Sequence, residues 1–392
     1  MNNYHTNRIK KLSDLLKEHN IDLAIILQNV DLYYLTGTLC QGALVINQEG
    51  KYIFAVAKPY ARAVAETSLE KVTDLGSMRY LPEVIAEFSP EAVKTSGFEL
   101  DTVPWKIINR IKKQFSDNLK LKDISPLLKS LRALKDDDEI KLIRKSGDIL
   151  SKTFAHLPQL IRVGKTELEI AADLESFMRK LGHQGFLRVR KFNMELYYGS
   201  LGTGSTVAYP TLFDGPVGNK GLYKAVPYFC SQRKVKAGDT FMVDIMAGYK
   251  GYLADATRTY HLPPYAEHIK KAHEIAIGID RHTRILLKPG TSPEQIYLDA
   301  LKIAEKHQLD SNFMGFDSNR VKFLGHGVGL EIDELPVLAK KFVNKLQAGN
   351  VIAVEPKFFF ANGAAGIENT YIINENGFEN VIDYPNDLVL LP

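Results

Sequence analysis

Hydrophobic and polar positions follow two different periods along this 392-residue chain. Apolar residues recur at the spacing of one helical face over residues 5–19, which predicts an amphipathic helix. The apolar run at 21–36 predicts a buried strand followed by a turn, and the stretch 42–56 predicts a hairpin around Glu49-Gly50. Because helix and strand patterns keep alternating to about residue 130, we expect an N-terminal α/β domain over residues 1–135.

Longer helical patterns begin after this point and predict a second domain over residues 136–392. An acidic run at 136–139 suits the start of a helix, where negative charge is favoured. Thr166 and Glu169 form a capping-box pattern that opens another helix. Two further helices are expected at 265–287 and 291–307, and strands are expected at 203–209, 239–247, 251–260, 321–332, 350–360 and 366–374. Long helices with hairpin strands predict an α+β fold.

Composition excludes several classes of protein. The formal net charge is only +4, and the basic residues are scattered, so no nucleic-acid partner is expected. Cys40 and Cys230 are too few for a disulfide framework or a thiolate metal site. No apolar run is long enough to span a membrane, and the N-terminus lacks the pattern of a signal peptide. We therefore expect a cytoplasmic protein without a membrane partner.

Two aspartates stand inside an otherwise apolar hairpin pattern. If Tyr249 and Lys250 are the central turn residues, Asp244 lies directly opposite Asp255 on the neighbouring strand. Facing carboxylates repel each other unless one takes up a proton or a cation lies between them. A divalent metal ion with oxygen ligands is the natural partner.

A second carboxylate pair, Glu355 and Glu368, flanks a turn expected at Asn362-Gly363, which would make the two glutamates diagonal neighbours on one face. Between the two pairs stands His326, flanked by glycines that allow close backbone approach. Considered alone, each carboxylate is consistent with a solvent-exposed charge on a hairpin, and His326 is consistent with a histidine buried in the core. Together they predict a site for two divalent ions, with Mn²⁺ preferred over Co²⁺, Zn²⁺ or Fe²⁺.

Four motifs carry a family resemblance. "DIMAGYKGYLADATRTY", "GHGVGLEIDELP", "VIAVEPKF" and "GIENTYII" resemble, in this order, the metal motifs of the pita-bread metallopeptidases, which include Xaa-Pro aminopeptidase, prolidase and creatinase. The segment "LAIILQNVDLYYLTGTLCQGALVINQEGKYIF" resembles the creatinase-type N-terminal domain. The resemblance covers nearly the whole chain. It implies a pita-bread catalytic domain preceded by a ribonuclease H-like α/β domain.

The resemblance implies a role for each of the five residues. Asp244 would ligate one metal, Asp255 and Glu368 would bridge both, and His326 would bind the other. Glu355 would ligate beside His326 and also serve as general base, while a hydroxide held between the ions would attack the scissile carbonyl.

The sequence departs from the family pattern around these ligands. Thr211 and Asp333 stand where family peptidases usually carry histidines that position the substrate carbonyl, and Gly366 stands where an arginine is common. With Glu334, Asp333 would form a negative wall suited to a cationic substrate. Because a preorganised oxyanion donor is still required, other residues must supply it. Arg188, Arg190 and Asn193, with Glu195 nearby, are candidates, although they read equally well as solvated strand residues.

The sequence thus predicts a metal-dependent hydrolase of a C–N bond, foremost an Xaa-Pro aminopeptidase or dipeptidase acting on a small peptide. One alternative is a non-peptidase amidohydrolase of a small cationic metabolite, similar to creatinase or ectoine hydrolase. Another is a catalytically inactive binding module of the same fold. A homodimer is expected from the resemblance alone.

Overall fold

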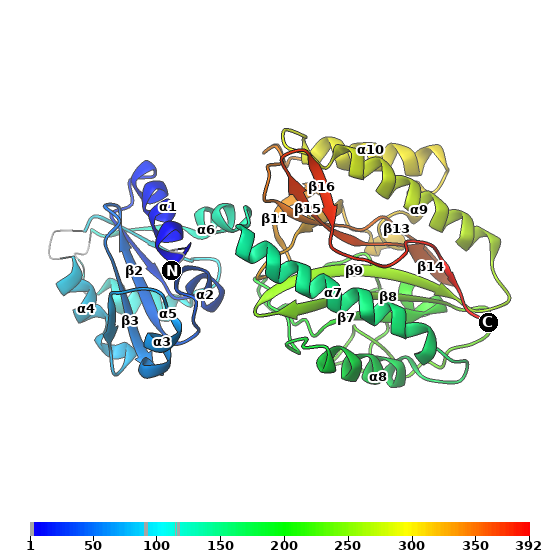
Figure 1. The fold of residues 1–392 in the computed structure, drawn as a ribbon, viewed down its shortest axis with the longest axis horizontal. Coiled ribbons are helices and arrows are strands. Elements are labelled where there is room, and N and C mark those ends of the chain that lie inside the picture. Colours follow the sequence, from blue (N-terminus) through cyan, green and yellow to red (C-terminus); the bar gives the residue numbers. More distant parts are fainter. Residues whose placement is uncertain (1–3, 90–92, 114, 116–117) are drawn as a thin grey trace. The chain divides into compact units, whose positions relative to one another are not determined.

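The computed structural model describes residues 4–89, 93–113, 115 and 118–392. The chain divides into two compact units, Met1–Arg132 and Ala133–Pro392 (Figure 1). The domain boundary expected from the sequence, at 135/136, lies slightly beyond this division. Each unit has its own sheets and its own buried apolar residues.

The N-terminal unit is built on one mixed sheet of six strands in the order β4-β3-β2-β1-β5-β6. The expected hairpin is present, since β2 pairs antiparallel with β3. The strands are β1 (Leu23–Ile26), β2 (Gln41–Asn47), β3 (Tyr52–Lys58), β4 (Val72–Asp74), β5 (Thr95–Phe98) and β6 (Lys120–Asp123). The helices are α1 (Tyr4–Glu18), α2 (Asn29–Thr36), α3 (Tyr60–Glu66), η1 (Met78–Tyr80), α4 (Leu81–Phe88), α5 (Trp105–Lys112) and α6 (Ser125–Arg132).

The C-terminal unit contains three sheets, ordered β17-β9-β8-β7, β11-β10-β12-β15-β16 and β13-β14. Their strands are β7 (Gly199–Thr203), β8 (Thr240–Tyr249), β9 (Tyr252–His261), β10 (Phe323–Gly327), β11 (Glu334–Ala339), β12 (Val351–Val354), β13 (Lys357–Phe360), β14 (Gly363–Gly366), β15 (Asn369–Asn374), β16 (Gly377–Asn380) and β17 (Val389–Leu390).

Four long helices cover these sheets in two pairs. Helices α7 (Asp137–Leu160) and α8 (Glu167–Lys180) pack together, with α7 on β8 and β9. Helices α9 (Glu267–Leu286) and α10 (Pro293–Lys306) pack together, with α9 on β13 and β14 and α10 on β10 and β11 (Figure 1). Short 3-10 helices are η2 (Gly204–Ala208), η3 (Asp310–Asn312) and η4 (Asp317–Asn319).

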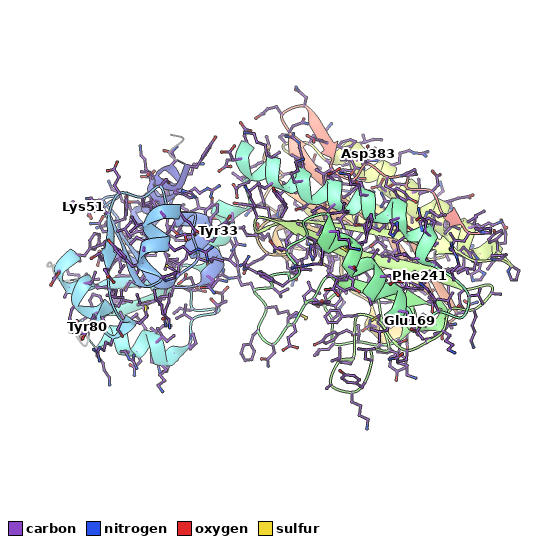
Figure 2. All side chains as sticks on the ribbon, turned by 60° about the horizontal axis from the view of Figure 1, so that its bottom comes forward. Tyr33, Lys51, Tyr80, Glu169, Phe241 and Asp383 are labelled. Carbon is purple, nitrogen blue, oxygen red and sulfur yellow. The ribbon has the colours of Figure 1, made fainter. Side chains whose placement is uncertain are left out.

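Local sequence signals set the starts of α7 and α8. The Asp136 side chain accepts hydrogen bonds from the backbone of Asp138 and Glu139, and the Glu139 side chain closes the capping box. The expected box between Thr166 and Glu169 is confirmed at α8, where Glu169 is marked in Figure 2. Such caps satisfy backbone N–H groups that have no partner inside the helix. They fix where α7, which covers β8 and β9, and α8, which packs on α7, begin.

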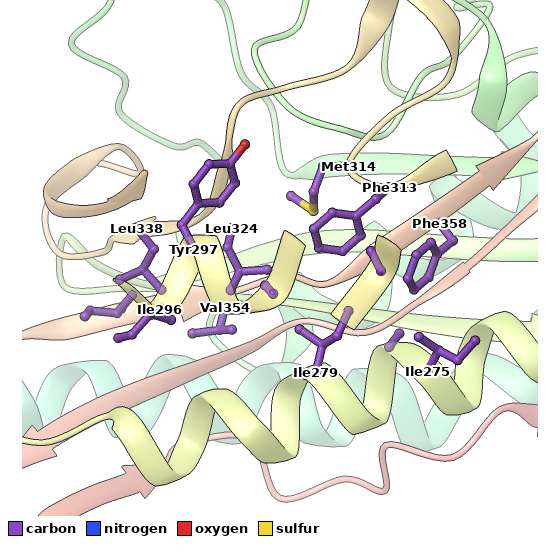
Figure 3. Close-up of a cluster of buried hydrophobic side chains, with 14 of the residues drawn as sticks. Ile275, Ile279, Ile296, Tyr297, Phe313, Met314, Leu324, Leu338, Val354 and Phe358 are labelled. Carbon is purple, nitrogen blue, oxygen red and sulfur yellow. The ribbon is translucent and has the colours of Figure 1, made fainter. Parts of the chain in front are cut away.

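A cluster of buried apolar side chains joins α9 and α10 to the strands beneath them. Ile279 of α9 and Ile296 of α10 lie in this cluster together with Leu324 and Val354 (Figure 3). Leu324 precedes His326 by two residues on β10, and Val354 directly precedes Glu355. Burial of a leucine or valine side chain stabilises the fold by roughly 1.5–3 kcal/mol. Packing of this cluster therefore holds two of the candidate ligand segments in place.

The expected strand at 321–332 extends only over Phe323–Gly327, and the one expected at 203–209 is wrong. The segment 203–209 continues only briefly as β7 and then turns into η2. The cause is a buried carboxylate: Glu167 accepts hydrogen bonds from the hydroxyls of Thr203 and Thr206 at 2.8 and 2.6 Å. These bonds draw the chain into a helical turn at Gly204, whose φ is +50°.

Among the described residues, no helix combines the length and hydropathy that crossing a bilayer requires.

Because His183 is buried, we expect the stability of the C-terminal unit to fall at acidic pH. Its Nδ1 accepts a hydrogen bond from the Gly248 N–H at 3.0 Å, and burial, reinforced by Arg179, lowers the pKa of His183 to about 4. Because this folded-state pKa lies below the unfolded value, neutral His183 stabilises the fold fully above about pH 6.5. That contribution is lost as the pH falls toward 4 and costs about 2 kcal/mol at pH 5.

His183→Gln keeps an acceptor for Gly248 but cannot titrate. We expect urea unfolding between pH 7.5 and pH 5 to show about 2 kcal/mol less loss of stability in His183→Gln than in the wild-type chain. Equal losses in both proteins would contradict a titrating His183.

Candidate metal centre

The β8–β9 hairpin carries the two aspartates in a register different from the expected one. Asp244 pairs with Thr257 and Asp255 pairs with Met246, so the predicted direct opposition of the two aspartates is wrong. The central turn residues are Lys250 and Gly251, with φ of +48° and +91°. Two-residue hairpins favour turns with positive φ at both positions, and Gly251 suits the second. Asp244 and Asp255 remain on one face as diagonal neighbours.

The glutamates are also shifted relative to the expected turn. Phe360 pairs with Gly363, which makes Ala361 and Asn362 the central turn residues, so the expected turn at Asn362-Gly363 is wrong. Strands β12 and β15 continue the same register and end with Val354 opposite Asn369. Extending this register by one residue places Glu355 opposite Glu368. The two glutamates thus lie across from each other where the strand pair passes from one sheet into another.

Strand β9 meets Glu368 and Thr370 by direct hydrogen bonds. The Thr257 hydroxyl donates to Glu368 Oε2 at 2.8 Å, and the backbones of the same two residues form a bridge. The Asp255 N–H donates to Thr370 Oγ1 at 2.9 Å. These bonds bring the aspartate hairpin and the glutamate strands, more than a hundred residues apart in sequence, into one site.

His326 on β10 presents one ring nitrogen to this site. Its Nδ1 lies 2.9 Å from the Ile332 carbonyl oxygen, which can only accept. Nδ1 must therefore carry the proton of the neutral ring, which leaves the lone pair on Nε2. Nε2 lies 3.9 Å from Asp255 Oδ2 and 3.8 Å from Glu355 Oε1. A backbone partner of this kind is the usual device that orients a metal-binding histidine.

The five expected ligands come together as two groups that share Glu368. One group consists of Asp255, His326 and Glu368, and the other of Asp244, Glu355 and Glu368. Within each group the potential ligand atoms lie within 4.8 Å of one another, and all five residues are buried. A set of four carboxylates and one imidazole is suited to divalent transition-metal ions.

Two observations show that the His326 group fits a metal ion. Asp255 Oδ1 is buried and has no hydrogen-bond partner among the described residues. Burial, together with the carboxylates of Glu368 and Asp244, raises the pKa of Asp255 well above its usual range. A buried carboxylate oxygen without a donor is costly. A cation beside Asp255 would remove that cost.

Lys357 is a site residue that the sequence motifs did not single out. Its side chain is fully buried, and its ammonium Nζ lies 2.9 Å from Asp244, 2.7 Å from Glu355 and 2.8 Å from Glu368. Burial alone would lower the pKa of Lys357, but these three carboxylates outweigh it and raise the pKa well above its usual value. The signal was available: a lysine two residues after Glu355 on a strand pattern shares its face.

Thr211 and Asp333 stand in different surroundings. The Thr211 hydroxyl donates to the Pro227 carbonyl at 2.8 Å and so is directed toward that loop. Asp333 lies 3.8 Å from His326 Nδ1, and its side chain is 49% exposed. Glu334 does not contribute to the predicted negatively charged surface. Its side chain is buried, and its carboxylate is paired with the Lys135 ammonium at 2.9 Å.

The remaining candidates lie along the loop that follows α8. Arg190 is 3.7 Å from the buried carboxylate of Glu331, and the Arg188 carbonyl accepts the Ile332 N–H beside the His326 segment. Asn193 and Glu195 are exposed, and Glu195 accepts a hydrogen bond from the Tyr228 hydroxyl at 3.3 Å. The arginines thus border the site region, whereas the described contacts of Glu195 are with Tyr228.

A mainly apolar pocket opens beside Asp244. Its wall includes Phe213, Val217, Phe229 and Met246. Tyr228 and Asn219 add polar groups. The volume of this pocket is about 10 Å³, which is room for about one water molecule.

Comparison with known proteins gives two family matches. The model of metallopeptidase family M24 matches residues 141–375, and the model of the creatinase/prolidase N-terminal domain matches residues 8–134. A Xaa-Pro dipeptidase from Pyrococcus horikoshii is 25% identical over 387 residues, which cover 97% of this chain and 98% of that protein.

Solved structures share the fold. The prolidase from Pyrococcus horikoshii OT3 aligns with a TM-score of 0.81 at 24% identity, covering 98% of this chain and all of that one. A Xaa-Pro dipeptidase from Bacillus anthracis aligns with a TM-score of 0.84 at 22% identity, covering 99% of this chain and all of that one. The expected α+β class, with a creatinase-type N-terminal domain and a pita-bread domain, is confirmed.

Proposed function

The chain belongs to metallopeptidase family M24, and from this premise we propose that it is a metal-dependent peptidase that cleaves the Xaa-Pro bond of small peptides. The similar proteins reported above are named as Xaa-Pro dipeptidases or prolidases. Those names favour the peptidase over a creatinase-like amidohydrolase or an inactive binding module. The observation that carries the proposal is the convergence of five buried ligand residues beside an apolar pocket.

The proposed metal centre consists of Asp244, Asp255, His326, Glu355 and Glu368, of which Asp244 and Glu355 also meet the buried ammonium of Lys357. A divalent ion bound there would supply Lewis acidity and lower the pKa of water. The chain's own contribution begins with orientation: Ile332 fixes the His326 ring, and Thr257 fixes the Glu368 carboxylate. Mn²⁺ is the proposed ion, because four hard carboxylates outnumber one imidazole.

Glu355 is the proposed general base and acid. One of its oxygens, Oε2, is bound to Lys357, which leaves Oε1 facing the His326 side of the site. Burial raises the pKa of Glu355, against the opposing effect of Lys357. A carboxylate with a raised pKa suits transfer of a proton to the leaving amine.

The pocket beside Asp244 is the proposed place for an apolar part of the substrate, such as the ring of a proline residue, and it must widen from its volume of about 10 Å³ to admit one. Arg188 and Asn193 are proposed to bind the peptide, with Arg190 as a further cationic group. Glu195 is a proposed contact for a substrate ammonium group. Thr211 would assist only if its hydroxyl turned away from Pro227. We further propose a homodimer, as the family resemblance implies.

The test is hydrolysis of an Xaa-Pro dipeptide and an Xaa-Pro-Yaa tripeptide by the full chain loaded with Mn²⁺. Cleavage by the wild type, absent in His326→Ala, would support the proposal, and the ratio of the two rates would separate a dipeptidase from an aminopeptidase. Metal-loaded protein that cleaves neither peptide would overturn it.

Asp333 provides a prediction about substrate charge. Its exposed carboxylate beside His326 can attract a cationic group but cannot donate a hydrogen bond when ionised. We expect Asp333→Ala to raise KM several-fold for Lys-Pro, because an exposed charge pair is worth up to about 1 kcal/mol. KM for Ala-Pro, which carries no side-chain charge, should change less. Equal changes for both peptides would contradict the role.

A further inference from the structure

We propose that the ammonium of Lys357 is a built-in replacement for one of the two divalent ions, so that this chain binds a single ion at Asp255, His326 and Glu368. The sequence motifs predict two ions instead. This inference rests on the proposed function only in taking the His326 group as a metal site.

The contacts of Lys357 cover one ligand group completely. Its Nζ lies within 2.9 Å of an oxygen of Asp244, of Glu355 and of Glu368, which are the three members of that group. An ammonium has three N–H donors, and three acceptors use them all. A divalent ion bound to the same oxygens would have to occupy the same space.

The position of Lys357 on its strand directs its side chain into the ligand group. Lys357 lies on β13, two residues after Glu355, and therefore on the same face of the strand. Its side chain is fully buried, so the ammonium does not reach solvent. A charged group enclosed in this way must remain beside anionic partners.

Gly366 makes room for this lysine. It stands directly opposite Lys357 in the β13–β14 register. A Cβ at position 366 would come within 2.6 Å of Lys357 Cα and 2.9 Å of Lys357 Cγ. Even an alanine at this position would crowd the lysine stem. The pair Lys357 and Gly366 therefore acts as one unit: the glycine lets the lysine enter the site.

Repulsion from the Lys357 ammonium opposes a second ion. The four carboxylates of Asp244, Asp255, Glu355 and Glu368 carry four negative charges when ionised. With one ammonium and one divalent ion the net charge of this set is −1, and with a second divalent ion it is +1, so the total charge alone does not decide between them. Like charges in a low-dielectric site repel strongly. The second ion would be opposed by Lys357 as well as excluded from its space.

The surroundings of Asp255 differ from those of Asp244, so the two ligand groups are not equivalent. Its Oδ1 has no partner among the described residues, and its Oδ2 lies 3.9 Å from His326 Nε2. That separation is too long for a hydrogen bond but suits two ligands of one ion, each about 2.0–2.2 Å from it. The half that holds His326 thus has a free ligand oxygen, and the half that holds Asp244 has the ammonium.

The experiment measures metal content rather than activity. Full-length protein is stripped with a chelator and titrated with Mn²⁺, and tightly bound metal per chain is determined by elemental analysis. We expect one ion per chain in the wild type and none in His326→Ala. We expect Asp244→Asn to keep its one ion, because Lys357 and not the metal contacts Asp244. A dinuclear site would lose an ion in that variant.

Lys357→Gly gives the converse result. With the ammonium removed and its space opened, we expect the variant to bind a second Mn²⁺ ion. Electron paramagnetic resonance should then change from the sharp hyperfine lines of an isolated ion to the broadened signal of a coupled pair. Lys135→Met is the matched control, because Lys135 is equally buried and paired with Glu334 outside the site. It should keep one ion.

Two tightly bound ions in the wild type, or loss of an ion from Asp244→Asn, would overturn the proposal. These two measurements decide it even if Lys357→Gly does not fold. Peptide hydrolysis is measured separately. A chain that binds one ion but cleaves no Xaa-Pro peptide would overturn the proposed substrate and leave the role of Lys357 intact.

Discussion

Glu355→Gln should reduce kcat for Xaa-Pro hydrolysis by roughly 10²–10⁴-fold, the range typical for loss of a general acid–base group. Glutamine keeps the size of the side chain and can still accept a hydrogen bond from Lys357, which lies 2.7 Å from the native carboxylate. It cannot take up and release a proton. Steady-state kinetics on the metal-loaded variant measures the effect, with metal content determined in parallel.

Glu139→Gln is the matched control for this change. Glu139 is also a buried glutamate of the C-terminal unit, but it serves the capping box of α7 and accepts a hydrogen bond from Tyr252 at 2.9 Å. Its substitution should lower stability and leave kcat of the folded protein close to that of the wild type. A Glu355→Gln variant that keeps full metal content and near-normal kcat would remove Glu355 from the reaction.

Arg258→Met should destabilise the C-terminal unit by several kcal/mol, because each buried acceptor left without a donor costs about 1–3 kcal/mol. The Arg258 side chain is fully buried, and burial lowers its pKa to about 10. Its guanidinium donates to the carbonyls of Glu368 and Thr257, the two residues that join β9 to the ligand strand. It also donates to Pro385, Asn369 and Tyr384.

Methionine fills much of the same volume but leaves these acceptors without a donor. Arg144→Met is the control, since Arg144 forms a two-bond pair with Glu379 but is 49% exposed. An exposed ion pair contributes up to about 1 kcal/mol. Urea unfolding of both variants should therefore separate them clearly. Equal destabilisation would show that burial of Arg258 does not carry the effect.

Local signals in the sequence were enough for much of the fold. An acidic run predicted the start of α7, a capping box predicted the start of α8, and helical patterns predicted α1, α9 and α10 to within a few residues. Motif order predicted the pita-bread family, which the family match confirms. These features depend on residues close together in the chain, so a single sequence carries them.

The register of the two hairpins could be determined only from the structure. Apolar alternation predicted both hairpins of the site, but a two-residue turn can be centred on neighbouring pairs of residues. The choice at Lys250-Gly251 depends on which residues accept positive φ. That choice moved Asp255 from a place opposite Asp244 to a place opposite Met246.

The sequence by itself determined which residues could bind metal and on which kinds of strand they lie, because side-chain chemistry and strand periodicity are local properties. Only the tertiary structure decided which oxygens converge and which cation meets them. Asp244 lies on β8, whereas Glu355 and Glu368 lie at the junctions of β12 with β13 and of β14 with β15, and the ammonium between them belongs to the buried Lys357. Long-range packing alone brings these charges together, and their mutual attraction depends on that distance.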